Sequence, residues 1–90
     1  MYKFLTTNQF EKEYKKIKKS GSKDMKKIKD VMFTLISGGA LPKKNRDHTL
    51  TGNYNGRQEC HIEPDWLLIY KIDNDTIIFE RTGSHSELFS

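Results

Sequence analysis

The sequence contains a single cysteine, Cys60, and only two prolines among its 90 residues. One cysteine cannot form an intrachain disulfide, so an oxidising compartment is not indicated. Long apolar runs are also missing. The longest is far shorter than a membrane span, and lysines interrupt the first 20 residues, where a signal peptide would need an apolar core. We therefore expect a cytoplasmic protein with no membrane partner.

Apolar residues are few as well, since 34% of the chain is hydrophobic and 31% is charged. Aromatic residues make up 11%, which is enough to build a thin core and more than a disordered chain usually carries. A chain of this length fits one domain, which we place at residues 1–90. The length excludes a two-domain enzyme with its own cofactor domain, and we expect no cofactor.

Positive and negative charges are divided unevenly along the chain. Residues 1–46 carry 13 basic and 4 acidic side chains, whereas residues 47–90 carry 3 basic and 8 acidic ones. A basic half suits a polyanion such as nucleic acid, although lysines on an amphipathic helix also serve simply to solvate its exposed face. The lysine candidates for RNA contact are Lys15, Lys16, Lys18 and Lys19.

The first 20 residues predict a strand followed by a helix. Residues 2–6 alternate and carry types that favour strands. Asn8 offers a helix N-cap, and Glu11 stands at capping-box spacing from it. The apolar stripe that follows, surrounded by lysines, predicts an amphipathic helix over residues 9–19.

A short link at residues 20–22 leads into a second amphipathic helix, whose apolar face runs from Met25 to Ile36. Gly38 follows, as glycine commonly does after a helix. Residues 40–55 hold few apolar anchors, so we expect a long loop there. A loop of this length in so small a domain usually has a function.

Three strand-like segments follow the loop. Residues 57–63 alternate between two faces, residues 66–72 are nearly all apolar as in a central strand, and residues 76–82 form the last strand. Short turns join these strands, so neighbours are antiparallel. The sequence predicts an α+β fold, with an antiparallel sheet, an N-terminal strand, a two-helix hairpin packed on one face and three consecutive strands.

All three histidines lie in the second half, near a carboxylate at a strand rim. His48 lies in the long loop, His61 and Asp65 flank a hairpin turn, and His85 follows the last strand. Histidine titrates near neutral pH, so it can take or give a proton there. RNA carries its own nucleophile, the ribose 2′-hydroxyl, and its cleavage needs a base, an acid and nearby positive charge, but no metal. These residues fit such a site, although histidines in small domains are often ordinary surface or capping residues.

Several other residues near this rim have two possible roles each. Arg57 and Arg81 are either phosphate contacts or strand-surface solubilisers. Trp66 and Phe89 are placed to stack on bases, although Trp66 is equally suited to the core. Histidine and aspartate are also zinc ligands, but their spacing matches no compact zinc signature, so we expect no metal. Cys60 falls on the apolar side of its strand, which favours packing over nucleophilic chemistry.

Three stretches of the second half form a distinctive pattern. They are Asp47-His48-x-Leu50-x-Gly52, the run ECHIEPDWLLIYK over residues 59–71, and the run FERTGSHSELF over residues 79–89. This pattern resembles the YafQ branch of the RelE/ParE toxin superfamily. The strand, helix, helix, three-strand order is similar to the fold of that family. The resemblance covers essentially the whole chain, but the lysine-rich helical hairpin is generic.

The resemblance implies the toxin of a bacterial type II toxin–antitoxin pair, which enters the ribosomal A site and cuts the mRNA there without a metal, inhibiting translation. It implies the ribosome and its mRNA as partners, together with a small cognate antitoxin encoded in the same operon. Operator DNA would be bound only through the antitoxin complex. The family's site residues fall on His48, His61, Asp65, His85, Trp66, Phe89 and Arg81.

The resemblance also implies how the proton transfers are divided. In related toxins the C-terminal histidine is the general acid, which is His85 here. His61 or His48 would be the base, with His61 favoured because a strand holds it more rigidly than a loop holds His48. Asp65 would orient the base histidine, and Arg81 would neutralise the phosphate as charge develops.

One position departs from the family pattern. Relatives tend to carry an arginine where this chain has Gln58, whereas Arg57 lies one place earlier. In a strand one step reverses the face, so Arg57 points with His61. It is therefore either a site residue peculiar to this chain or has no part in the site.

Two other functions are compatible with parts of this pattern. A ParE-like inhibitor of DNA gyrase would have the same fold but would need no acid–base group, so the histidine set favours the nuclease. A DNA-binding repressor in its own right is disfavoured because no helix-turn-helix signature is present, and the two helices look suited to covering a sheet.

Overall fold

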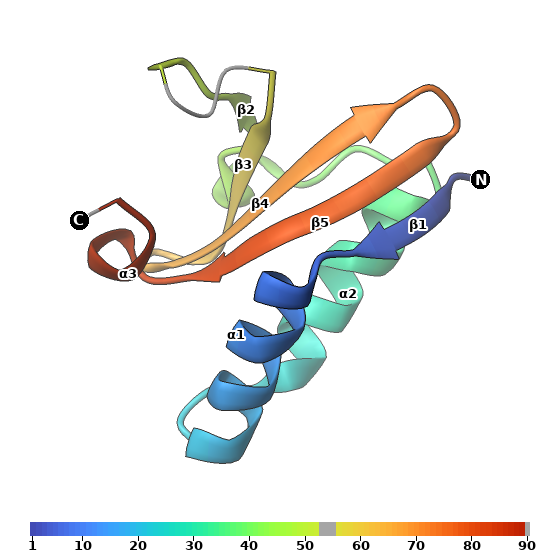
Figure 1. Ribbon diagram of the computed structural model, residues 1–90. Helices are drawn as coiled ribbons and strands as arrows, with labels where there is room; N and C mark the ends of the chain where they lie inside the picture. Colours follow the sequence, from blue (N-terminus) through green and yellow to red (C-terminus); the bar gives the residue numbers. More distant parts are fainter. Residues whose placement is uncertain (53–55, 90) are drawn as a thin grey trace.

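The computed structural model describes residues 1–52 and 56–89 (Figure 1). Its elements are β1 (Lys3–Thr6), α1 (Asn8–Ser20), α2 (Met25–Ile36), the 3₁₀ turn η1 (Lys43–Asn45), β2 (His48–Thr49), β3 (Gln58–Glu63), β4 (Trp66–Asp73), β5 (Thr76–Gly83) and α3 (His85–Phe89). The strands and long helices predicted from the sequence are confirmed. Three short elements were not predicted from the sequence: η1 and β2, which fall in the expected loop 40–55, and α3. Residues 53–55 of that loop lie outside the described residues.

The five strands form one sheet in the order β1-β5-β4-β3-β2, with β4 in the centre as expected. Strands β2 to β5 pair antiparallel in sequence, but β1 pairs with β5 in parallel. The antiparallel pairing predicted for the three consecutive strands is confirmed, but β1 departs from the predicted antiparallel sheet, so the sheet is mixed. The physical reason is that only a hairpin forces neighbouring strands to be antiparallel, and the α1–α2 hairpin separates β1 from all the other strands. Figure 1 shows both long helices on one side of the sheet.

Helix α1 begins where Thr7 caps it. The Thr7 hydroxyl accepts a hydrogen bond from the backbone N–H of Phe10 at 3.0 Å and donates one to the carbonyl of Glu80 at 2.9 Å. The expected cap, Asn8, is instead the first residue of the helix. Gly21 ends the helix with φ of 68°, a left-handed conformation that glycine adopts without strain. Thr7 thus fixes the start of α1 to β5.

The main core lies between the sheet and the two long helices. Its largest fully buried side chains come from both layers and include Trp66, Tyr70, Phe10, Phe79 and Ile28. Cys60 belongs to this core, which confirms its packing role, and burial raises the pKa of its thiol.

A second, smaller cluster lies on the opposite face of the sheet. Leu67 and Ile69 of β4 alternate away from the long helices and pack with Leu88 of α3, while Leu50 lies against them. Because apolar contacts hold α3 and the residue after β2 here, the loop and the end of the chain are brought over the same face.

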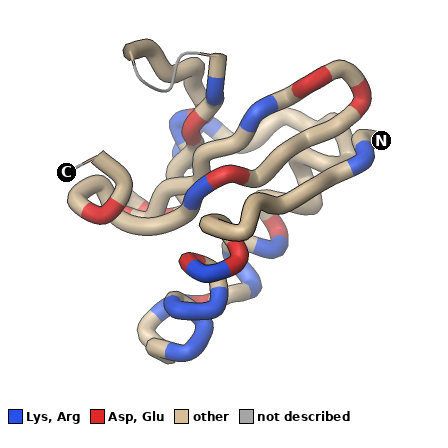
Figure 2. Tube along the Cα trace, in the orientation of Figure 1, with Lys and Arg blue, Asp and Glu red and all other residues tan. Residues whose placement is uncertain are grey.

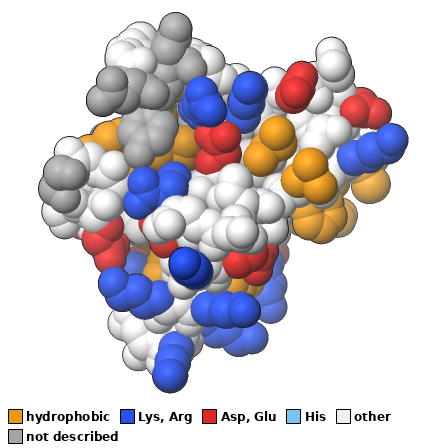
Figure 3. Space-filling view, in the orientation of Figure 1, with side chains coloured by type: hydrophobic (Ala, Val, Ile, Leu, Met, Phe, Trp, Pro, Cys, Tyr) orange, Lys and Arg blue, Asp and Glu red, His pale blue; other side chains and the backbone are white. Residues whose placement is uncertain are grey.

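Charge is segregated between the two halves of the structure. Figure 2 shows lysines along α1, the link and α2, and Figure 3 shows their side chains covering the helical end of the molecule. Within the described residues, none of the helices has the length and hydropathy needed to cross a membrane.

Candidate active site

Three histidine rings lie in a row on the sheet face that carries the smaller cluster. The ring centroids of His48 and His61 are 6.3 Å apart, and those of His61 and His85 are 5.6 Å apart. The ring of Phe89 follows, 6.2 Å from His85. Sequence spacing left open whether His48 and His85 reach the rim of His61, and the structure brings all three together.

Strand pairing positions the first two rings. His48 of β2 lies opposite Glu59 of β3, and His61 follows Glu59 by two residues, so both β3 side chains point to the same face. The intervening Cys60 points into the main core. The alternation predicted for this strand is therefore what builds one end of the site.

Glu59 is the site residue that the sequence analysis missed. Its side chain is buried, and its Oε1 lies 3.3 Å from Nε2 of His48 and 3.6 Å from Nε2 of His61. The other oxygen, Oε2, is also buried and has no hydrogen-bond partner among residues 1–52 and 56–89. A buried carboxylate is costly unless it is paired. The one available signal was the alternation of β3, which places Glu59 beside His61.

Backbone carbonyls determine which nitrogen of each ring carries the hydrogen. Nδ1 of His48 lies 2.6 Å from the carbonyl of Arg46, and Nδ1 of His61 lies 3.1 Å from the carbonyl of Pro64. A carbonyl oxygen can only accept, so each Nδ1 donates. Each neutral ring therefore has its proton acceptor at Nε2, and a proton taken there faces the Glu59 carboxylate.

Asp65 contacts His85 rather than the base histidine to which the sequence analysis assigned it. Its Oδ1 accepts hydrogen bonds from the backbone N–H and from Nδ1 of His85, both at 2.9 Å. The backbone bond, followed by the ring bond, holds the pKa of Asp65 below its usual value. The α3 turn brings His85 onto Asp65, which a reading of the hairpin alone could not show. With Nδ1 donating, His85 has Nε2 left to give a proton.

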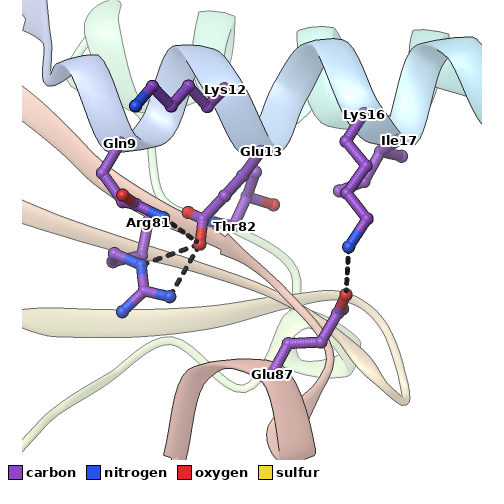
Figure 4. Close-up of a pocket in the computed structure, with 8 residues that line it drawn as sticks. All are labelled: Gln9, Lys12, Glu13, Lys16, Ile17, Arg81, Thr82 and Glu87. Carbon is purple, nitrogen blue, oxygen red and sulfur yellow. Dashed lines mark hydrogen bonds and ion pairs between the residues drawn. The ribbon is translucent and has the colours of Figure 1, made fainter.

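The two arginines expected at the phosphate both bind carboxylates. Arg81 donates through Nη2 and Nε to Oε2 of Glu13, at 2.7 Å and 2.9 Å, across the gap between β5 and α1 (Figure 4). Arg57 lies on the face of His61 as predicted, but its Nε donates to Oε1 of Glu80 at 2.8 Å. That hydrogen bond raises the pKa of the Arg57 guanidinium.

The two aromatic candidates differ in exposure. Trp66 has no exposed surface, and its ring N–H donates to the Thr82 hydroxyl at 3.1 Å. Of its two possible roles, packing is confirmed, and stacking on a base is wrong because the ring is enclosed by the core. Phe89 is 44% exposed and lies beside His85, so its position suits a base contact.

The lysines chosen from the sequence lie apart from the histidine row. They are exposed on α1, which covers the other face of the sheet: Lys15, Lys16, Lys18 and Lys19. Lys16 forms a 3.7 Å ion pair with Glu87 of α3 (Figure 4). These lysines can extend a binding surface but do not contact the rings.

Three of the site residues also offer ligands for a metal ion. One atom each of Glu59, His61 and His85 lies within 4.8 Å of the other two. Carboxylate oxygen and imidazole nitrogen suit zinc and copper. Sequence spacing gave no sign of this set because its members come from β3 and α3.

Comparison with known proteins identifies relatives over the whole length. The family profile described as "Bacterial toxin of type II toxin-antitoxin system, YafQ" matches residues 2–90. The mRNA interferase toxin YafQ of Escherichia coli strain K12 is 43% identical over 84 residues, which is 92% of this chain and 90% of that protein.

Solved structures agree with this match. The E. coli DinJ–YafQ toxin–antitoxin complex superposes with a TM-score of 0.91 at 40% identity, covering 99% of this chain and 98% of the other. A copper-bound mutant toxin from Helicobacter pylori gives a TM-score of 0.91 at 36% identity, covering 99% of this chain and 100% of the other. Both share the strand, two-helix and mixed-sheet arrangement.

Proposed function

Because the chain belongs to the YafQ family of bacterial toxins of type II toxin–antitoxin systems, we propose that it is an mRNA interferase. It would cleave mRNA in the ribosomal A site and so inhibit translation. The observation that carries this proposal is the row of three histidines, each of which lies against one of two carboxylates. A ParE-like gyrase inhibitor of the same fold acts by binding and has no use for such a row.

His61 is the proposed general base. Its ring is adjacent to that of His85, at 5.6 Å, so these two rings can flank one phosphate, whereas His48 neighbours only His61. Nε2 of His61 takes the proton of the ribose 2′-hydroxyl, and Glu59 stabilises the resulting imidazolium. His48 contacts the same carboxylate oxygen and holds it in place.

His85 is the proposed general acid. As the 2′-oxygen bonds to phosphorus, the bond from phosphorus to the 5′-oxygen breaks, and Nε2 of His85 gives its proton to that oxygen. The products carry a 2′,3′-cyclic phosphate and a 5′-hydroxyl. Asp65 holds the His85 ring through Nδ1. Arg81 would have to exchange Glu13 for the phosphate in order to stabilise its charge.

This chemistry needs no metal, because the base, the acid and the nucleophile are all supplied by the protein and the RNA. The copper-bound H. pylori relative shows that a toxin of this fold can hold a metal ion. In this chain an ion on Glu59, His61 and His85 would occupy the nitrogen atoms that the reaction uses. We therefore propose that metal binding here would inhibit.

The proposed partner is a cognate antitoxin, as DinJ is for E. coli YafQ. A hollow of about 290 Å³ lies between β1, α1 and α2, with Phe4 and Phe33 exposed along it and Lys29 at its side. The helices around it carry most of the lysines. An acidic, amphipathic antitoxin segment would match both the apolar hollow and this charge.

Primer extension on mRNA bound to purified ribosomes tests the activity. Wild-type toxin should cut in the A site, and His85→Ala should cut about 10²–10⁴ times more slowly in single turnover while still binding the ribosome. Ser86→Ala, one residue along α3, is the matched control and should cut normally. Inhibition of DNA gyrase by the wild type without any mRNA cleavage would favour the alternative function.

A further inference from the structure

A basic turn lies beside the histidine row, between α2 and β2. It consists of η1 and the following Arg46, and its three cationic side chains are exposed: Lys43, Lys44 and Arg46. In the described part of the chain, none of the three forms an ion pair with a carboxylate. The basic turn thus differs from Arg57 and Arg81, which are both paired.

Two contacts fix the basic turn to the histidines. Asn45 is buried, and its side-chain amide donates to the carbonyl of His61 at 2.7 Å. Arg46 has φ of 46°, a left-handed conformation that is uncommon for a residue other than glycine. Its carbonyl accepts the Nδ1–H of His48. The same short segment therefore presents cations, orients the ring of His48 and holds the backbone of His61.

A hollow of about 570 Å³ lies between the basic turn, α2 and the end of β3. Its lining includes the cations Lys44, Arg46 and Lys27, and it also includes His61 of the histidine row. Lys27 donates to Glu63 at 2.8 Å, which raises the pKa of the lysine and lowers that of the carboxyl. The basic turn supplies the cations of this hollow that have no carboxylate partner.

The histidine row itself offers RNA little positive charge. Its partners Glu59 and Asp65 are carboxylates, which repel phosphate at short range. Phosphate contacts supply most of the affinity of proteins for nucleic acid and set the register of the strand. A neighbouring group of fixed cations is therefore needed to hold the backbone against the rings.

We propose that the basic turn binds the phosphates on the 5′ side of the cut, so that the RNA runs 5′ to 3′ from the turn, across the row, to Phe89. This direction rests on the proposed function. The nucleotide that carries the attacking 2′-hydroxyl lies on the 5′ side and must meet the base, His61, whereas the leaving 5′-oxygen must meet His85. The basic turn and His48 lie beyond the base, and Phe89 lies beyond the acid.

The test combines a protein variant with single neutral phosphates in the mRNA. In Lys44→Gln/Arg46→Gln the backbone carbonyl that holds His48 remains. Lys3→Gln/Lys26→Gln, on β1 and α2, removes the same charge away from the rings. Ribosome-bound mRNAs carry a methylphosphonate either one position 5′ or one position 3′ of the scissile phosphate. Cleavage is measured below saturation, and thermal melting checks that each variant is folded.

On unmodified mRNA, the turn variant should lose about tenfold or more in cleavage, as expected for lost charge-assisted contacts, and the control variant should not. The 5′ methylphosphonate should slow the wild type and add no further loss in the turn variant. The 3′ methylphosphonate should slow both equally. The proposal would be overturned if the turn variant cut all three mRNAs more slowly than the wild type by the same factor. It would also be overturned if only the 3′ methylphosphonate removed the difference between the two proteins. If wild-type toxin cuts none of the mRNAs, the proposed function itself fails, and the proposal fails with it.

Discussion

At the scale of single residues, Glu59 contacts the site histidines, but the burial of its carboxylate lowers the stability of the fold. One oxygen contacts two histidines, and the other is buried with no hydrogen-bond partner in the described chain. Glu59→Gln keeps the shape but removes the charge. We expect cleavage on the ribosome to fall about 10²–10³-fold. The free energy of unfolding in urea should rise by about 1 kcal/mol, because a neutral amide is less costly to bury than a carboxylate.

Glu63→Gln is the matched control, two β3 positions beyond His61. Glu63 forms ion pairs with Lys23 and Lys27 and does not contact a histidine ring. Its substitution should change the unfolding free energy by less than about 1 kcal/mol and should leave cleavage intact, since partly exposed pairs are weak. A Glu59→Gln variant that is destabilised and still cuts at the wild-type rate would show that Glu59 serves the fold instead.

The possible metal ligands lead to a second prediction at this scale. Zinc or copper added to the toxin should inhibit cleavage at about one ion per molecule, because the ion takes the ring nitrogens of His61 and His85. Titration calorimetry beside the cleavage assay measures both effects. His48→Ala, which leaves the three ligands in place, should still bind the ion. Stimulation of cleavage by the metal would contradict the metal-independent mechanism.

At the scale of elements, α3 depends on two carboxylates. Asp65 accepts the backbone N–H of His85, and Glu87 accepts that of Ser84 at 2.8 Å, and each of these bonds holds the pKa of its carboxyl low. A depressed pKa means that the stabilisation is fully present at neutral pH and is lost as the pH falls below about 4 through the lower pKa of the folded state. We expect α3 to detach there before the sheet unfolds, as measured by amide NMR signals of residues 84–88.

Asp65→Asn tests how much Asp65 contributes to this acid-induced detachment of α3. The amide oxygen can still accept the N–H of His85, but it carries no charge to lose, so the acid transition of α3 should become smaller. Cleavage at neutral pH should fall, since an amide stabilises a charged His85 ring less well. Unchanged protection of α3 down to pH 2.5 in the wild type would show that apolar contacts of Leu88 suffice to hold it.

The sequence predicted those elements in which apolar residues recur with a clear helix or strand periodicity. The stripe of α1 and the alternation of β3 were sufficient, because each buries one face against the same core. The predictions that failed concern features that are set by contacts between residues far apart in the sequence. The cap of α1 is Thr7 because its hydroxyl also reaches β5, and the parallel pairing of β1 follows from a long crossover. Strand β2 has two residues, too few to show any period.

The candidate site was predictable in its residue types but less so in their pairing. His48, His61, Asp65 and His85 do come together. His48 and His61 pair with Glu59, whereas His85 pairs with Asp65. This division depends on α3, a helix of five residues that is too short to show an apolar stripe. The sequence pattern also does not show which face of β4 carries Trp66, because this strand is apolar on both faces, and the structure places Trp66 in the main core.

At the scale of the whole molecule, the lysines of α1 and the histidine row occupy different faces. We expect the α1 lysines to bind ribosomal RNA while the row faces the mRNA. Replacing Lys15, Lys16, Lys18 and Lys19 by glutamine should weaken ribosome association and lower the slope of log affinity against log salt by up to about 3. Sedimentation at several salt concentrations measures this. An unchanged slope would mean that the lysines only solvate the helix. Once the ribosome is saturated, single-turnover cleavage should be normal, which separates docking from chemistry.

The parallel pairing of β1 with β5 also affects when the toxin becomes active during its own synthesis. Thr7 meets Glu80 across 73 positions, and the histidine row needs a residue of α3. Chains emerge from the ribosome in order, and contacts so distant in sequence form late. On the proposed mechanism, a nascent chain with α1 and α2 already folded would therefore have neither a complete sheet nor its general acid. We expect such a chain to be inactive while it is being made, which would give a co-translated antitoxin time to reach it.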